Sequence, residues 1–217
     1  MDIDKIQGYL REHQLDGWLM ADFHARNSVA VEMLGLTGVL TRRSFYFIPV
    51  EGTPVGLVPE IEKAKFQHLP GTLIPFSGYR AMEKELTLIL KGHKSVAMEY
   101  SRMGRLPYIG LVDAGTVEMV RSMGVEVVSS ADLVAAFQAR LTREQIATHR
   151  DAVLKLIEAK DDAFAFITQS LKDSTPVTEY DVSQRIFERF KTHGMTTDFA
   201  PICAVDGNAG NPHYQPT

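Results

Sequence analysis

The residues with the clearest chemical potential lie at the end of the sequence, where a loop presents a histidine beside a tyrosine. An apolar run, 199–205, is followed by a loop rich in glycine and asparagine, 206–212, and then by His213 and Tyr214. Glycine in a loop allows the backbone to come close to a ligand. A histidine held there can act as a proton shuttle, a hydrogen-bond donor or a metal ligand. The pattern alone leaves open whether His213 has such a role, because most histidines take no part in catalysis, and whether Tyr214 orients His213, binds substrate or simply packs.

Other side chains that often carry chemistry do not form a recognisable site. The single cysteine, Cys203, is predicted to be a small buried residue on a strand, since a nucleophilic cysteine needs a nearby base and a lowered pKa. Asp198 and Asp206 are predicted to be a strand-start residue and a turn residue. No histidine has a partner at the spacing of a zinc motif, and there is no phosphate-binding loop or Gly-x-Ser-x-Gly elbow. No metal site is therefore predicted within this sequence.

The composition predicts a soluble globular protein of the cytoplasm. Hydrophobic residues make up 45% and charged residues 23% of the 217 residues, and the formal net charge is -4. Lys and Arg are scattered, whereas binding to nucleic acid or an anionic membrane requires clustered positive charge. No apolar run approaches the ~20 residues of a membrane span, and the first ten residues lack the features of a secretory signal. One cysteine cannot form an intrachain disulfide, which favours a reducing compartment.

The elements that must position the loop fall into two groups, which we assign to domains 1–140 and 141–217. In the first group strands alternate with helices, and the runs 44–50 and 55–58 predict a hairpin around the turn 51–54. This pattern predicts an α/β domain in which helices cover a mixed sheet. Further strands are predicted at 18–20, 72–76, 95–98 and 125–128, and helices at 3–15, 26–34, 61–66, 81–90, 109–123 and 132–140.

The pattern changes at Leu141, where long helices replace the alternation. Thr142 and Gln145 form a capping-box signature, and apolar residues then recur every three or four positions over about 30 residues. Thr178 is predicted to cap a further helix that extends to about Lys191. A strand is predicted at 199–205, so this second domain combines long helices with a strand, an α+β composition.

The order of these features resembles the front half of the pita-bread metallopeptidases of the Xaa-Pro aminopeptidase and prolidase kind. The resemblance implies that the second domain is the beginning of an α+β pita-bread catalytic domain and is incomplete. In the second domain the resemblance is carried by the long helix, by Thr-Glu-Tyr-Asp-Val at 178–182, and by Gly-Asn and Pro-His-Tyr after the last predicted strand. In the first domain Met-Leu-Gly-Leu-Thr-Gly at 33–38 is similar to the Tyr-Leu-Thr-Gly segment of the family's amino-terminal domain. The hairpin 45–58 also fits the creatinase/prolidase amino-terminal domain.

The resemblance implies metal-dependent hydrolysis of the bond before proline in short peptides. His213 matches an active-site histidine that stabilises the tetrahedral intermediate or helps to move a proton. Two divalent ions (Mn, Co or Zn) share a water in this chemistry. Their five ligands, two Asp, one His and two Glu, follow the position of His213 in the family. We therefore expect a longer parent protein to be active and this chain to be inactive by itself.

The resemblance also implies roles for the first domain, which would form homodimer contacts and restrict access to short peptides. Arg26 and Asn27 precede the segment that sometimes approaches the partner subunit's active site in the family. Arg42 and Arg43 could bind a substrate carboxylate, since an arginine fork binds carboxylates through two hydrogen bonds, and we take Arg43 as the candidate. The alternative for these residues is an ordinary polar surface.

Two other functions fit the same resemblance. The first is a non-catalytic peptide-binding or dimerisation module, because a histone chaperone subunit uses the two-domain fold without its metal ligands. The second is a creatinase-like amidinohydrolase, because a fold does not determine its substrate. If the longer parent protein has all five metal ligands, it would be an enzyme. If some of them are missing, it would be a binding module.

Overall fold

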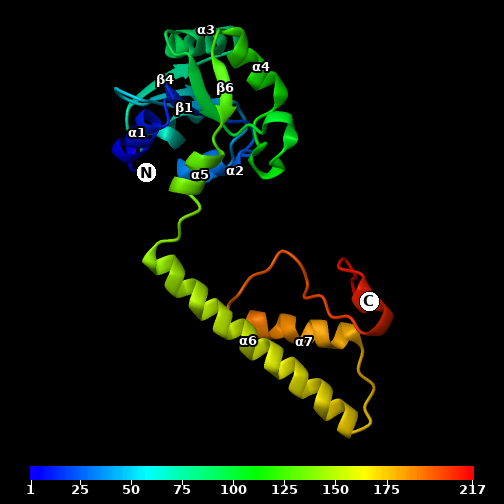
Figure 1. The fold of residues 1–217 in the computed structure, drawn as a ribbon. Helices are drawn as coiled ribbons and strands as arrows, with labels where there is room; N and C mark the ends of the chain where they lie inside the picture. Colours follow the sequence, from blue (N-terminus) through cyan, green and yellow to red (C-terminus); the bar gives the residue numbers. More distant parts are fainter. The chain divides into compact units, whose positions relative to one another are not determined.

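The structure is a computed structural model that describes residues 1–217, and the chain divides into two compact units (Figure 1). The first, called unit 1, comprises Met1–Arg140, and the second, called unit 2, comprises Leu141–Thr217. No helix combines the length and the apolar composition needed to cross a membrane.

Unit 1 is built on a six-stranded mixed sheet with the strand order β4-β3-β2-β1-β5-β6. Strand β2 is antiparallel to both of its neighbours, β1 and β3, whereas all other pairs are parallel. Five strands therefore have their carboxyl ends at one edge of the sheet, where β2 begins. The predicted mixed α/β sheet is confirmed. The strands are β1 (Gly17–Asp22), β2 (Ser44–Pro49), β3 (Val55–Pro59), β4 (Thr72–Phe76), β5 (Ser95–Met98) and β6 (Glu126–Ser129).

Helices cover both faces of this sheet, because the central strands are buried on both sides. Alternate residues of β1 point to opposite faces. Trp18 packs in a core with residues of α1, α2 and α5, and Leu19 packs in a second core with residues of α3 and α4. The helices are α1 (Ile3–Glu12), α2 (Ser28–Met33), α3 (Tyr79–Leu90), α4 (Ala114–Ser122) and α5 (Ala131–Phe137), with 3-10 segments η1 (Glu60–Phe66), η2 (Arg102–Gly104) and η3 (Pro107–Ile109).

Two of the predicted helices differ from the structure. The helix predicted at 109–123 begins only at Ala114, because the Asp113 side chain accepts a hydrogen bond from the Thr116 amide and fixes the start of α4 there. The segment predicted as a helix at 61–66 forms the 3-10 segment η1 instead. Both segments connect a strand with the next part of the chain, where short tight turns often replace a full α-helix.

Unit 2 contains two long helices, α6 (Arg143–Lys172) and α7 (Glu179–Thr192), and the 3-10 segment η4 (Asp206–Gly210). The capping box predicted at Thr142 is confirmed, since the Thr142 side chain accepts from the Gln145 amide and the Gln145 side chain accepts from the Thr142 amide. Thr178 caps α7 in the same way with Asp181. The two helices are joined by ion pairs, of which Arg185 with Asp162 is bidentate at 2.7 and 3.1 Å.

The strand predicted at 199–205 is absent. A strand requires a hydrogen-bonded neighbour, and unit 2 offers none. The segment is held instead by side chains of α7: the Ser183 hydroxyl donates to the Pro201 carbonyl at 2.6 Å, and the Val205 amide donates to Glu179 at 2.7 Å. Cys203, predicted to be buried on this strand, is only partly buried.

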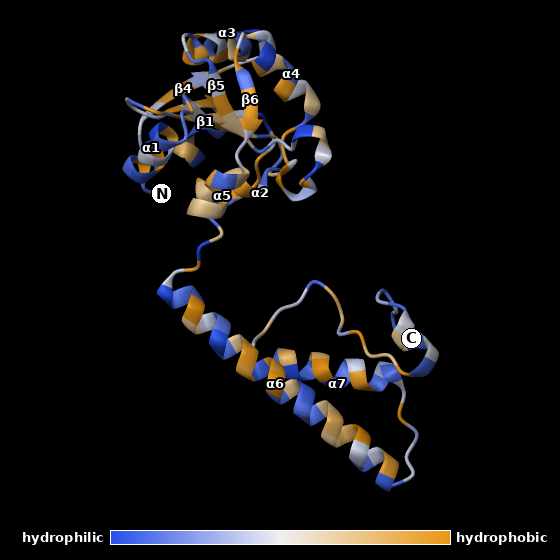
Figure 2. Cartoon of the chain, viewed as in Figure 1, coloured by the Kyte–Doolittle hydropathy of each residue, from blue (hydrophilic) through white to orange (hydrophobic).

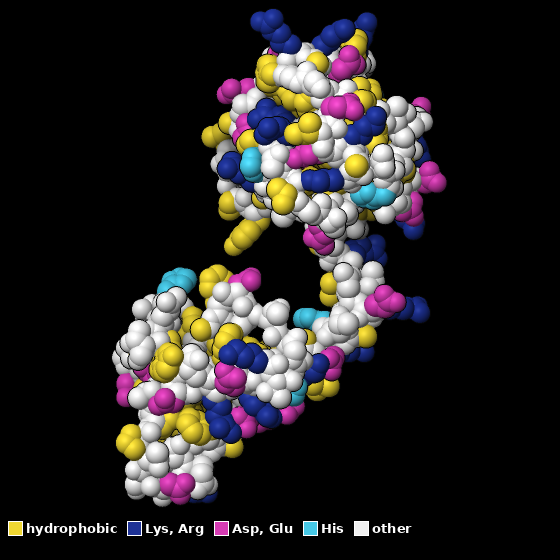
Figure 3. All heavy atoms as spheres, turned by 180° about the vertical axis from the view of Figure 1, so that it is seen from behind, with side chains coloured by type: hydrophobic (Ala, Val, Ile, Leu, Met, Phe, Trp, Pro, Cys, Tyr) yellow, Lys and Arg dark blue, Asp and Glu magenta, His cyan; other side chains and the backbone are white.

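Unit 2 also exposes apolar side chains along one face of α6. Leu154, Ile157, Phe164 and Leu171 are spaced so that they share one side of the helix, and each is between 47% and 68% exposed. Figure 2 shows the alternation of apolar and polar residues along α6, and Figure 3 shows apolar side chains at the surface of this unit. A stripe of this kind is typical of a helix that packs against a further layer.

Candidate functional site

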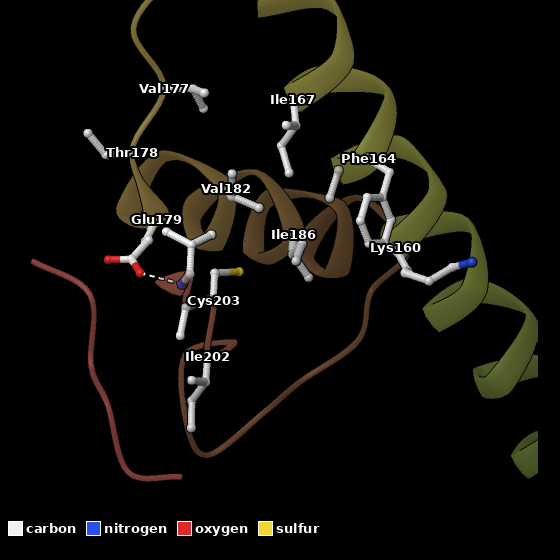
Figure 4. A pocket seen from close by; sticks show the side chains of 13 residues that line it. Lys160, Phe164, Ile167, Val177, Thr178, Glu179, Val182, Ile186, Ile202 and Cys203 are labelled. Carbon is white, nitrogen blue, oxygen red and sulfur yellow. Dashed lines mark hydrogen bonds between the residues drawn. The ribbon is translucent and has the colours of Figure 1, made fainter. Parts of the chain in front are cut away.

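The candidate site in unit 2 is an open apolar cavity of about 650 Å³ between α6, α7 and the segment 202–205 (Figure 4). Phe164 and Ile167 reach it from α6, and Val182 and Ile186 reach it from α7. Its volume lies within the range of small-molecule sites, but most of its wall is aliphatic. The charged residues of its lining are Lys160 on α6 and Glu179, the first residue of α7.

Glu179 holds the carboxyl-terminal loop in place. Its carboxylate accepts hydrogen bonds from the Val205 amide at 2.7 Å, from the Asn208 side chain at 3.1 and 3.2 Å, and from the Tyr214 hydroxyl at 2.5 Å. These three donors come from positions 26 to 35 residues further along the chain. One carboxylate therefore fixes the whole loop that carries His213 onto the amino terminus of α7.

These contacts shift the pKa of the groups that take part. The hydrogen bond from Tyr214, followed by that from the Val205 amide, lowers the pKa of Glu179 below its ordinary value. The same bond raises the pKa of the Tyr214 hydroxyl, because a neighbouring carboxylate disfavours the phenolate. Burial, and then the charge of Glu179, raises the pKa of the Cys203 thiol, which is the opposite of what a nucleophilic cysteine requires.

His213 is exposed and is placed by its neighbours in the loop. Its backbone amide donates to the Asn211 side chain at 3.0 Å, and the next residue, Tyr214, is tied to Glu179. The structure thus brings Tyr214, but not the His213 ring, into a hydrogen bond with another side chain of unit 2. The imidazole is exposed and makes no hydrogen bond within the chain, and its catalytic role stays a prediction.

The described residues do not supply a complete metal site. No group of three or more His, Cys, Asp or Glu side chains lies close enough together to hold a metal ion. A two-metal hydrolase needs several carboxylates around the shared water. The residues of this chain therefore do not fit the pair of divalent ions that the resemblance implies.

Arg43, the predicted substrate-binding residue, lies in unit 1 directly before β2. It is partly buried, and its guanidinium lies 3.7 Å from an Asp113 carboxylate oxygen and 5.9 Å from the centre of the Phe23 ring. It lines two cavities, of about 610 and 300 Å³, at the edge of the sheet where β1 ends. Arg26 lines the smaller cavity, whereas Asn27 is buried and caps α2.

Sequence reasoning did not identify Glu179 as the organising residue of the loop. The available signal was the pair Thr178-Glu179, since an acidic residue directly after an N-cap lies where helix amides attract negative charge. That signal gives a reason for an acid at this position. It does not reveal that the loop 205–214 returns to it, because that contact depends on the path of the chain.

We expect replacement of Glu179 by alanine to release this loop. Amide exchange at Val205 should accelerate roughly tenfold or more, since three donors lose a charged acceptor. Glu188→Ala, at an exposed acid of the same helix, serves as the control. Equal exchange rates in the two variants, measured by hydrogen–deuterium exchange, would contradict this role of Glu179.

The same contacts predict a pH dependence. Because the pKa of Glu179 is lowered in the folded chain, its contribution to stability is fully present above the ordinary value of 4.5. That contribution is lost as the pH falls through the lowered folded value. Protection of the Val205 amide against hydrogen exchange should therefore decrease on acidification in the unsubstituted chain. The Glu179→Ala variant should show no such decrease.

Comparison with known proteins places this fold among peptidases. A search of family models and a search of curated proteins both give no match. Among solved structures, the chain matches a prolidase from Thermococcus sibiricus with 18% identity and a TM-score of 0.64, over 100% of this chain and 57% of that one. The dipeptidase PepE from Mycobacterium ulcerans matches with 16% identity and a TM-score of 0.65, over 99% of this chain and 55% of that one.

A dipeptidase from Pyrococcus horikoshii OT3 matches to the same extent, with 18% identity, a TM-score of 0.62, and 100% and 57% coverage. The chain therefore shares the fold of prolidases and dipeptidases, as its sequence predicts. It spans about half the length of the solved structures it matches.

Proposed function

We propose that this chain is the amino-terminal half of a cytoplasmic, metal-dependent peptidase that hydrolyses the Xaa-Pro bond of short peptides. The observation that carries this proposal is the structural match of nearly the whole chain to a prolidase and to two dipeptidases. At 16–18% identity the match supports the fold, and the activity is our inference from it.

The surface of unit 2 supports the view that further structure covers it. The cavity of about 650 Å³ is open, the stripe on α6 is exposed, and the segment 199–205 has no neighbouring strand. Unpaired extended backbone beside apolar side chains is a common site for the addition of a strand. In the parent protein, the remaining strands of the catalytic domain would cover this face.

The roles of individual residues follow from this proposal. His213 would lie beside the scissile bond and assist in proton movement or in stabilising the tetrahedral intermediate, and Tyr214 would contact the substrate. The divalent ions would be held by residues outside this chain, because the residues described here do not fit them. Unit 1 would contribute to a homodimer and limit substrates to short peptides.

A side-by-side assay tests the proposal. Xaa-Pro dipeptides and creatine are supplied, with added manganese, cobalt or zinc, to this chain and to a longer protein that contains it. We expect peptide hydrolysis by the longer protein and none by this chain. Hydrolysis of creatine alone would indicate the amidinohydrolase, and peptide binding without turnover would indicate a binding module; either result would overturn the proposal.

A further inference from the structure

The loop 206–212 contains a dipeptide whose chemistry the proposed peptidase does not use. Asp206 is followed directly by Gly207, and both residues are exposed. In such a pair the backbone nitrogen of the glycine can attack the side-chain carboxyl carbon of the aspartate, because glycine has no Cβ to shield that nitrogen. The chain has one other Asp-Gly pair, Asp16-Gly17, where β1 begins. Comparison of the two pairs separates the effect of structure from that of sequence.

Both reacting groups are free at Asp206-Gly207. The Asp206 carboxylate accepts no hydrogen bond within the chain, and the Gly207 amide donates none. A Cβ added at Gly207 would meet no atom within 4 Å, so the loop is open at this point. Asp206 also has a φ of 46°, which is strained for a residue with a side chain. The two groups can therefore approach each other without displacing a packed neighbour.

The pair Asp16-Gly17 has the opposite surroundings. The Asp16 carboxylate accepts hydrogen bonds from the backbone amides of Lys94 and Ser95, the latter at 3.0 Å. Gly17 is buried in β1, which lies between β2 and β5. An attack by the Gly17 nitrogen would require the Asp16 side chain to leave both donors and a central strand to change its path. The fold therefore protects this pair from the same reaction.

We propose that Asp206 is a site of spontaneous isoaspartate formation, and that this change releases the loop that carries His213. In the first step the Gly207 nitrogen forms a bond to Cγ of Asp206, and the amide proton and a carboxyl OH leave as one water molecule. In the second step the resulting succinimide ring takes up one water. Opening of the ring at its main-chain carbonyl leaves the chain connected through Cγ, which is isoaspartate. The reaction needs no oxidant or cofactor, and it does not depend on the proposed peptidase activity.

Isoaspartate adds one carbon atom to the main chain between Val205 and Asn208. The Asn208 amide donates to the Val205 carbonyl at 3.0 Å, and this bond closes the turn that contains Asp206 and Gly207. The Val205 amide and the Asn208 side chain also donate to the Glu179 carboxylate, at 2.7 and 3.1 Å. A longer main chain changes the spacing of these two donors, and hydrogen bonds weaken steeply when their geometry is lost. Glu179 then no longer holds the loop.

The test begins with the 217-residue chain, kept for several weeks at physiological temperature and neutral pH. Trypsin then releases the peptide 192–217, which contains Asp206, and the peptide 12–26, which contains Asp16. Isoaspartate has the same mass as aspartate, so it is quantified with an isoaspartate methyltransferase and located by fragmentation. We expect at least about tenfold more isoaspartate at Asp206 than at Asp16. In denaturant the two fractions should become similar, because neither pair is then protected by the fold.

Two variants should change the yield of isoaspartate in opposite directions. Gly207→Ala should lower it at least about tenfold, because the new Cβ shields the nitrogen and the loop has room for it. Asp206→Asn should raise it, because ammonia leaves more readily than water in the same ring closure, and asparagine tolerates a positive φ. Gly210→Ala is the matched control, since this glycine is equally open but does not follow an aspartate.

The release of the loop is measured separately, by hydrogen–deuterium exchange. Amide exchange at Val205 and Asn208 should be roughly tenfold faster in Asp206→Asn after conversion to isoaspartate than in the same variant when fresh. Unchanged exchange would show that the modified loop stays bound to Glu179 and would overturn the second part of the proposal. Equal isoaspartate at Asp206 and Asp16 in the folded chain, or equal yields in Gly207→Ala and Gly210→Ala, would overturn the first part.

Discussion

Glu99→Ala should destabilise unit 1 by about 3–5 kcal/mol, a large part of the 5–15 kcal/mol that holds a typical domain folded. Glu99 follows β5, and its side chain is fully buried. Its carboxylate accepts from the Trp18 indole at 2.7 Å, from the Asn27 amide group at 2.6 Å and from the Ser130 hydroxyl at 3.0 Å. Removing this carboxylate takes an acceptor away from three buried donors. A buried donor without a partner raises the free energy of the folded state.

The loss of stability in Glu99→Ala should be larger than that caused by a simple cavity, because the Glu99 contacts join several elements. Asn27 caps α2, Ser130 precedes α5, and Trp18 lies near the start of β1, so one carboxylate joins three elements. Trp18 is the only tryptophan in the chain, and its fluorescence therefore reports on unit 1 alone. Denaturant unfolding followed by this signal gives the free energy of unfolding.

Glu83→Ala, at an exposed acid of α3, is the matched control and should change the free energy of unfolding by less than about 0.5 kcal/mol. Glu99→Gln keeps one acceptor oxygen and should cost less than Glu99→Ala. A loss below about 1 kcal/mol in Glu99→Ala would contradict the proposed role of this network.

The charge of Glu99 adds a pH dependence with a defined sign. Burial raises the pKa of Glu99, and the three donors only partly oppose this effect. A raised folded pKa means that the contribution of Glu99 to stability is fully present below the ordinary value of 4.5 and is lost as the pH rises through the folded value. In unfolding curves measured at a series of pH values, Glu99→Gln should not show this loss of stability with rising pH.

His213→Ala should lower kcat of the longer protein by about 10²–10³, the range for a residue that moves a proton or stabilises an oxyanion. The reason is its place in the loop, exposed and fixed by Asn211 and by the bond from Tyr214 to Glu179. Because His213 would act on the reacting bond, KM should change less than kcat.

Two further variants complete the His213 experiment. His149→Ala, at an exposed histidine of α6, is the control and should leave kcat unchanged. Tyr214→Phe removes the hydrogen bond to Glu179 and should have a smaller effect than the loss of His213. If His213→Ala and His149→Ala have the same kcat, His213 is not catalytic.

The sequence predicts those parts of the fold that depend on nearby residues. The capping boxes at Thr142 and Thr178 are visible because their partners are three residues away, and the alternating strands and helices of unit 1 follow from hydrophobic periodicity. The prediction begins this helix at residue 109, whereas α4 begins at Ala114. The apolar pattern starts upstream of Asp113, the N-cap that fixes the start of the helix in the structure.

The parts that sequence reasoning missed depend on distant contacts. The contacts of Glu99 with Trp18 and of Glu179 with Tyr214 join residues 81 and 35 positions apart. The pattern at 199–205 predicts a strand that the structure does not form, because a strand also needs a hydrogen-bonded neighbour. Similarly, the joint position of Arg26 and Arg43 around Phe23 becomes visible only when β1 and β2 are paired.

The most direct test of the central claim is the initial rate of Ala-Pro hydrolysis by a longer protein that contains this chain, with Ala-Ala as the comparison substrate. The rate is measured across a titration of manganese and again after removal of metal with a chelator. The account predicts metal-dependent cleavage of Ala-Pro, at least about tenfold faster than that of Ala-Ala, and loss of activity with the chelator. Absence of Ala-Pro cleavage with manganese, cobalt and zinc alike would contradict it.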